Sequence, residues 1–386
     1  MTLRFALTVG ERSGDALAGA IAEALRRREP GIELIGVTGP RMRAAGVATL
    51  ADVDELGVMG LFEVARHVPR LWRLRRRLRR DMLAAGCDAF VGVDAPDFNL
   101  GLARSLRRAG VTTVQVVAPS VWAWRRYRIP KIARSLDSLL TLFPFEPALF
   151  DGTGLDAQFI GHPLADALPR PPDRDAARRA LGLDADDTVI ALLPGSRGGE
   201  IARHAPVLTE LAARLAARRP CRMLLLLADE ADRERFGAAA GRDPAEAGLE
   251  VVAGRTREGL TAADVAVAAS GTVTLEGLLC RSPMVVFYRL PAATYGLARA
   301  LRLVKSRHVS LPNVLADEAL VPERLQHDAT PERLLADVEA WLDDPDRVAA
   351  YRERATAIHA RLTRSAAERA AERIIELAQR RALSRS

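Results

Sequence analysis

The 386-residue chain is too long for one ordinary hydrophobic core and fits two domains. Hydrophobic residues make up 49% of it, which is enough for two packed cores and excludes an intrinsically disordered chain. The formal net charge of +7 favours an anionic partner such as a phosphate, a nucleotide, a nucleic acid or a membrane surface. No hydrophobic run reaches the roughly 18–20 residues that a membrane-spanning helix needs.

Short hydrophobic runs alternate with helical patterns along the first part of the chain. We predict that Leu3–Val9 is a buried strand and not a signal peptide, because it is short and leads directly into a glycine-rich turn. The protein is therefore expected to stay in the cytoplasm. Asp15–Arg28 has the pattern of a helix. Further strands are predicted at 32–37, 89–93, 113–117, 138–143 and 158–160.

A proline-rich segment interrupts this series. Leu168–Arg174 contains three prolines, which fit neither a helix interior nor a central strand, so a domain linker is predicted there. The predicted domains are residues 1–167 and 175–345. Strand–helix alternation in both predicts two parallel sheets with helices on both faces, an α/β fold. The strands expected in the second domain are 189–193, 223–227, 249–252, 265–268 and 284–288.

Two motifs of the first domain follow predicted strands, where ligands bind in open α/β sheets. In Gly10–Asp15, glycines and Ser13 could turn backbone N–H groups toward a ligand oxygen, although a tight turn with a helix cap explains the pattern equally well. Asp94 and Asp97 lie three residues apart and are suited to taking a proton from a hydroxyl. Asp97 and Asn99 could instead cap the next helix, whereas Asp94 directly follows the strand.

Trp122 and Arg125 belong to a third motif of the first domain, at 118–128. Aromatic faces beside arginines suit a sugar or a phosphorylated lipid. Packing of the tryptophan in the core is the alternative interpretation.

Two loops of the second domain have the composition of a phosphate site. Residues 194–200 combine glycines and a serine with Arg197, which can neutralise phosphate charge. Residues 269–276 place small hydroxyl residues at a helix start, and Glu276, one turn later, could accept hydrogen bonds from a ribose or could simply be a surface residue. The candidate donor-binding residues in these loops are Gly195, Ser196, Ser270, Gly271 and Thr272.

Several other chemistries have no support in the sequence. There is no GxxxxGK[ST] phosphate loop, no HExxH and no GxSxG, and the six histidines and three cysteines lack metal-ligand or disulfide spacing. No metal or cofactor is therefore expected. The chemistry is expected to come from carboxylates, arginines and helix ends.

The segment Arg70–Arg80 is dense in arginine and carries Leu71, Leu74 and Leu78 at helical spacing. A basic amphipathic helix of this kind can lie on an anionic bilayer, and a solvated helix face is the alternative. Tyr295–His308 is a second basic and hydrophobic stretch. The residues expected to contact the membrane are Arg73, Arg76, Arg77 and Arg80.

Taken in order, the motifs resemble those of the lipid-A-disaccharide synthase family. They are GERSGD, GVMGLFEV, VGVDAPDFNL, APSVWAWRRYR, FPFEPALFD, FIGHPLAD, LLPGSRGGEI, ASGTVTLEGLL, MVVFYR, VSLPNVLAD and VPERLQHDATPERL. The resemblance implies a GT-B fold, in which a cleft separates two Rossmann-like domains and a C-terminal helical segment, here about 350–386, crosses back to the N-terminal domain. It also implies an inverting, metal-independent transfer from UDP-2,3-diacylglucosamine to 2,3-diacylglucosamine 1-phosphate. The products would be the β(1→6) disaccharide 1-phosphate and UDP.

The resemblance also implies roles for individual residues. Asp94 would be the general base and Arg197 would stabilise the UDP leaving group, with Asn313 joining the nucleotide-binding residues. The residues assigned to the acceptor or its sugar are Ser13, Asp97, Asn99, Trp122 and Arg125. Acylated substrates imply contact with the anionic inner face of the inner membrane, and a second copy of the chain is a candidate partner.

Two competing hypotheses remain at the level of the sequence. Another GT-B enzyme acting on a UDP-amino sugar, such as a UDP-N-acetylglucosamine epimerase or a peptidoglycan glycosyltransferase, would explain the nucleotide loops but not the DAPDFN and SVWAW motifs. A nucleic-acid-binding or membrane-binding module would explain the charge, but no recognised nucleic-acid-binding motif supports binding to a nucleic acid.

Overall fold

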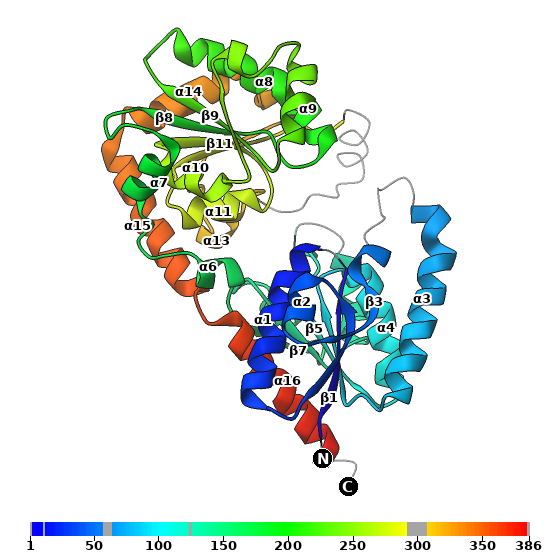
Figure 1. Ribbon diagram of the computed structural model, residues 1–386. Helices are drawn as coiled ribbons and strands as arrows, with labels where there is room; N and C mark the ends of the chain where they lie inside the picture. The colour runs from blue at the N-terminus through cyan, green and yellow to red at the C-terminus, as the bar shows by residue number, and fades with distance from the viewer. Residues whose placement is uncertain (1, 11, 57–63, 123–125, 292–306, 384–386) are drawn as a thin grey trace. The chain divides into compact units, whose positions relative to one another are not determined.

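The computed structural model describes residues 2–10, 12–56, 64–122, 126–291 and 307–383, without the side chains of 12, 13 and 64–68. The chain divides into two compact units (Figure 1). Unit 1 consists of Met1–Asp166 and Leu362–Ser386, and unit 2 of Ala167–Arg361. No helix in the described part of the chain is long and apolar enough to cross a membrane.

Within the described residues, unit 1 has a seven-stranded parallel sheet in the order β3-β2-β1-β4-β5-β6-β7. The strand order reverses beside β1, so the C-terminal ends of β1 and β4 form the topological switch point where ligands bind in such sheets. The strands are β1 Arg4–Val9, β2 Glu33–Thr38, β3 Ala48–Asp52, β4 Ala89–Val93, β5 Thr112–Val116, β6 Ser138–Thr141 and β7 Asp156–Phe159.

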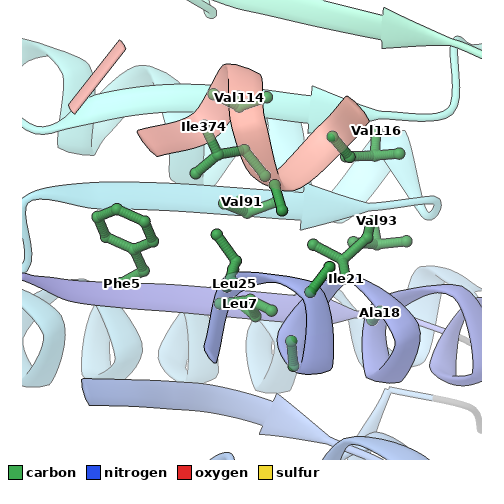
Figure 2. Close-up of a cluster of buried hydrophobic side chains, with 14 of the residues drawn as sticks. Phe5, Leu7, Ala18, Ile21, Leu25, Val91, Val93, Val114, Val116 and Ile374 are labelled. Carbon is green, nitrogen blue, oxygen red and sulfur yellow. The ribbon is translucent and has the colours of Figure 1, made fainter. Parts of the chain in front are cut away.

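Helices cover both faces of this sheet. On one face α1 and α16 pack against β1, β4 and β5, where Leu25 of α1 and Ile374 of α16 lie against Leu7 and Val91 (Figure 2). On the other face Leu78 of α3 and residues of α4 and α5 complete a second core. The helices are α1 Arg12–Arg28, α2 Pro40–Ala44, α3 Val64–Ala84, α4 Pro96–Arg108, α5 Ile129–Ala133, α6 Pro163–Ala167 and α16 Ala366–Leu383, with 3-10 turns η1 Val53–Glu55, η2 Arg126–Arg128 and η3 Pro147–Phe150.

Unit 2 repeats the plan with a six-stranded parallel sheet among the described residues, in the order β10-β9-β8-β11-β12-β13. The strands are β8 Val189–Leu193, β9 Arg222–Leu227, β10 Glu250–Ala253, β11 Val265–Ala269, β12 Met284–Tyr288 and β13 Glu323–Leu325. The helices are α7 Arg174–Leu181, α8 Gly198–Ala216, α9 Ala231–Ala240, α10 Thr256–Ala262, α11 Val273–Leu279, α13 Leu311–Ala316, α14 Pro331–Leu342 and α15 Pro345–Leu362, with η4 Ala245–Ala247 and η5 Gln326–Asp328.

The predicted pair of parallel α/β sheets is confirmed. The return of the chain to unit 1 begins at Leu362, later than the expected position near residue 350. The reason is that α15 still packs in unit 2, where the buried rings of Tyr351 and Trp341 meet edge to face at 5.5 Å. Two strands, β3 and β13, were not predicted.

Candidate functional site

Asp94 lies at the switch point of unit 1, directly after β4. Its backbone is left-handed, with φ 54°, and Ala95 follows at φ 41°. Side-chain amides of Asn99 and Gln115 donate to the Asp94 carbonyl oxygen at 2.8 and 2.9 Å. The Asp94 side chain is half-buried. Its backbone is thus fixed by side chains of α4 and β5, while its carboxylate remains accessible at the C-terminal end of β4.

The glycines of the turn after β1 allow that turn to approach Asp94 closely. A Cβ on Gly10 would overlap the Cβ of Ala95, and a Cβ on Gly14 would lie 3.5 Å from the Cβ of Asp94. Glycine is therefore required at position 10 for the close packing of the two loops. Ser13 lies in the first turn of α1, and its side chain is outside the described residues.

Asn99 has a different role from the predicted contact with the acceptor. It is fully buried, its Oδ1 accepts from the Thr8 hydroxyl at 2.8 Å, and its Nδ2 donates to Asp94. A side chain with both ends engaged inside the sheet cannot also meet a ligand. Asn99 instead connects β1 to the loop that carries Asp94.

Replacing Asn99 with alanine should lower the free energy of unfolding by about 1–3 kcal/mol, because the Thr8 hydroxyl and the Asp94 carbonyl each lose a partner. Urea denaturation measures this change. Turnover should fall as well, since Gln115 alone would then hold the Asp94 carbonyl. Thr8→Val removes only one of these hydrogen bonds and should cost less. Unchanged stability of the alanine variant would contradict this role for Asn99.

Two of the remaining acceptor candidates, Asp97 in the first turn of α4 and Trp122 after β5, lie within the described residues. Asp97 is exposed (79% of its side chain) and pairs with Arg128. Trp122 is half-buried, and its ring meets that of Phe145, from the loop after β6, edge to face at 5.7 Å. Arg125 lies outside the described residues. Asp97 and Trp122 are therefore both accessible to solvent, and both lie after strands of the same sheet as Asp94.

Glu146 is a buried carboxyl group on that loop that the sequence analysis did not single out. Its Oε2 accepts from the backbone N–H groups of Leu142 and Phe143 at 3.2 and 3.0 Å. Burial raises the pKa of Glu146 to about 8, although these two hydrogen bonds favour the ionised form. Glu146 stabilises the turn after β6 through these two hydrogen bonds. Nothing in the surrounding sequence indicated that this carboxyl group would be buried.

Loops after β8, β9 and β11, together with the start of α10, enclose a cavity of about 250 Å³ in unit 2. Five of the predicted donor-binding residues and Arg197, predicted to stabilise the leaving group, line it together, although the two loops that carry them are far apart in the sequence. They are Gly195, Ser196, Arg197, Ser270, Gly271 and Thr272. Leu226, Ala228 and Thr256 also line the cavity and were not predicted, because none of them belongs to a motif that was assigned to the site.

Glu200 organises the loop between β8 and α8. Its carboxylate accepts from Arg197 Nη1 at 3.2 Å and from the Tyr288 hydroxyl at 2.9 Å. Burial disfavours its ionisation, but the hydrogen bonds from Tyr288 and Arg197 outweigh burial and lower the pKa of Glu200. Gly195 has φ 104°, and a Cβ there would press on the Glu200 side chain. Only glycine fits this position without strain.

Two other donor candidates lie outside the residues that line this cavity. Asn313 is buried, and its amide bonds twice with Val321 and once with Glu323, all at 2.8–2.9 Å. The prediction that it contacts the nucleotide is therefore replaced by a structural role. Glu276 is half-buried on α11; burial raises its pKa, and the charge of Arg257 opposes that shift. Glu276 does not line the cavity.

The leucine stripe of α3 faces the interior of unit 1 and is not available to a bilayer. Leu74 and Leu78 are buried in the core of unit 1, and Leu71 packs against it. The outer face instead carries the four predicted arginines and Trp72, which is 54% exposed and lies under the Arg76 guanidinium at 4.6 Å. The surface available to a bilayer is therefore cationic and aromatic.

Comparison with known proteins identifies relatives along nearly the whole chain. A family described as Lipid-A-disaccharide synthetase matches residues 5–377. A lipid-A-disaccharide synthase from Azotobacter vinelandii is 48% identical over 98% of this chain and 99% of its own. One from Pseudomonas aeruginosa UCBPP-PA14 is 46% identical over 98% and 99%.

Solved structures share the fold at low sequence identity. The UDP-GlcNAc 2-epimerase of Neisseria meningitidis bound to UDP-GlcNAc has a TM-score of 0.64 at 10% identity, over 97% of this chain and 99% of that chain. MurG of Acinetobacter baumannii has a TM-score of 0.60 at 16% identity, over 97% and 100%.

Proposed function

The chain belongs to the lipid-A-disaccharide synthase family, a family of glycosyltransferases in lipid A biosynthesis, and on this premise we propose how its two sheets divide the reaction. Unit 2 binds UDP-2,3-diacylglucosamine, and unit 1 binds 2,3-diacylglucosamine 1-phosphate. The observation that carries the proposal is the cavity in unit 2, which is lined by one glycine from each predicted phosphate loop, by three hydroxyl side chains of these loops and by Arg197. Gly195, Ser196, Ser270, Gly271 and Thr272 are assigned to the diphosphate and its nucleoside.

In the proposed reaction the Asp94 carboxylate takes the proton of the acceptor 6-hydroxyl. The oxygen then attacks the donor C1 from the face opposite to UDP, the bond from C1 to the UDP oxygen breaks, and the anomeric configuration inverts. Negative charge accumulates on the departing diphosphate. Arg197 and the N-terminus of the 19-residue helix α8 stabilise that charge. Asp97 and Trp122 are assigned to the acceptor.

Release of UDP from the donor, with and without the acyl-sugar phosphate, tests this assignment. We expect UDP and disaccharide in equal amounts, and only when both sugars are present. UDP release or epimerisation without the lipid-linked sugar would favour the competing GT-B hypothesis.

The substrates' acyl chains require access to a membrane surface, and we assign this contact to the outer face of α3. Arginine side chains attract anionic lipid headgroups, and an exposed tryptophan is suited to the interface between headgroups and hydrocarbon. Arg77 and Arg80 lie near Glu55 and Asp81, at 3.6 and 2.9 Å. Arg73 and Arg76 have no carboxylate partner among the described residues.

Replacing Arg73 and Arg76 with glutamine should weaken binding to anionic vesicles by about 30-fold, since each basic residue near such a surface contributes about 1 kcal/mol. Vesicle sedimentation at physiological salt measures the effect. Turnover of detergent-dispersed substrate should change little.

The matched control replaces Arg179 and Arg218, two exposed arginines of unit 2, and should leave vesicle binding unchanged. Equal losses in both variants would mean that net charge, and not α3, determines binding. If vesicle binding were unchanged in both variants, the membrane contact would have to be assigned to Tyr295–His308, which lies largely outside the described residues.

A further inference from the structure

Two residues at the end of β12, Tyr288 and Arg289, hold the loop between β8 and α8 at two separate points. The first point is His204, a fully buried residue of α8. Its Nδ1 lies 2.7 Å from the Pro194 carbonyl oxygen, and its Nε2 accepts from the Arg289 backbone N–H at 3.2 Å. A ring that accepts at Nε2 is neutral and donates from Nδ1. Consistently, burial lowers the pKa of His204.

The second point is Tyr288, whose hydroxyl donates to Glu200 Oε1 at 2.9 Å. Its ring also meets the His204 ring at 5.3 Å and 66°. The two contacts hold the loop on either side of Arg197, at Pro194 and at Glu200 in the first turn of α8. Arg197 lies between these ends, and its backbone N–H and its guanidinium both donate to the Glu200 carboxylate, at 3.4 and 3.2 Å.

The direction of the Glu200 carboxylate matters because Glu200 lines the cavity. A carboxylate that turned toward a bound diphosphate would repel it. The Glu200 side chain is only 13% exposed, whereas that of Arg197 is 81% exposed. The hydrogen bond from the Tyr288 hydroxyl therefore holds the Glu200 carboxylate in a buried position, while the Arg197 side chain extends into solvent.

We propose that Tyr288 is a positioning residue for Arg197, which it orients through Glu200 so that the loop is arranged to receive the diphosphate of the donor. The inference rests on the proposed function, in which this cavity binds UDP. It adds a residue from β12 that touches neither the diphosphate nor the reacting atoms.

Tyr288→Phe tests the proposal by removing one hydroxyl and little volume. The dissociation constants of UDP and of uridine are measured for the wild type, for Tyr288→Phe, for Arg197→Ala and for the double variant. Loss of a hydrogen bond to a charged group should weaken UDP binding by about 10-fold. Uridine binding should change less than about 2-fold, because uridine lacks the diphosphate that Arg197 meets. In the Arg197→Ala background, Tyr288→Phe should have almost no further effect, as expected for residues that act as a unit.

Tyr351→Phe is the matched control, since it removes another buried tyrosine hydroxyl of unit 2, one without a hydrogen-bond partner among the residues that the structure describes. It should leave both affinities unchanged. Equal weakening of UDP and uridine by Tyr288→Phe, or additive effects in the double variant, would overturn the proposal and leave Tyr288 a packing residue. Failure of the wild type to bind UDP would overturn the proposed function as well. Normal UDP binding that depends on Arg197 but not on Tyr288 would overturn this inference alone.

Discussion

Asp94→Asn should lower turnover by about 10²–10⁴-fold while UDP affinity stays near that of the wild type. The acceptor hydroxyl is a weak nucleophile until its proton is removed, and general base catalysis typically contributes a factor of this size. The substitution suits the site because asparagine tolerates the left-handed backbone that Asp94 adopts, with φ 54°. Steady-state turnover and UDP titration on the same preparation separate lost chemistry from lost folding.

Asp97→Asn is the control for this variant. It removes a carboxylate three residues away, in the first turn of α4, but one that is exposed and paired with Arg128, and it should affect the Michaelis constant of the acceptor more than turnover. More than a third of wild-type turnover in Asp94→Asn would remove Asp94 from the role of base. A larger loss in Asp97→Asn would transfer that role to Asp97.

Arg197→Ala should lower turnover by about 10²–10³-fold and weaken UDP binding as well, because in the proposed reaction Arg197 meets charge that is present in the ground state and grows as UDP leaves. Arg197→Lys should fall between alanine and the wild type, since an ammonium keeps the charge but not the planar fork of donors. Kinetics with the diacylated donor and UDP titration measure the two effects.

The same experiment tests whether the charge is carried by the protein alone. Wild-type activity should survive EDTA, as the family resemblance implies. Loss of activity in EDTA that magnesium restores would show that a metal ion shares the work of Arg197. Full turnover in Arg197→Ala would mean that other groups at the cavity stabilise the charge of the diphosphate.

The sequence predicted the two sheets because buried parallel strands are nearly continuous hydrophobic runs. It did not predict β3 and β13, because these short edge strands, ATLAD and ERL, contain no continuous hydrophobic run, whereas the edge strands β7 and β10 were predicted. Val91 and Val267 belong to central strands and were predicted; Thr49 and Arg324 belong to edge strands and were not.

Motif positions were predictable for the site, but side-chain directions were not. A polar residue just after a strand can face a ligand or return to the backbone, and its partners decide between these outcomes. Asn99 turns inward because Thr8, which lies 91 positions away in sequence, donates to it. The leucines of α3 are a second example, because helical spacing predicts an apolar face but does not indicate whether protein or lipid covers it. The structure shows that protein covers Leu74 and Leu78.

The position of α16 also sets the order in which the protein can be completed during synthesis. The core of unit 1 contains Leu7 and Val91, which precede unit 2 in the sequence, but also Ile374 and Ala378 of α16, which leave the ribosome after all of unit 2. All of unit 2 lies between these parts. Unit 1 is therefore begun before unit 2 and completed after it, and until α16 docks, part of the apolar face of β4 and β5 stays exposed to chaperones and to aggregation.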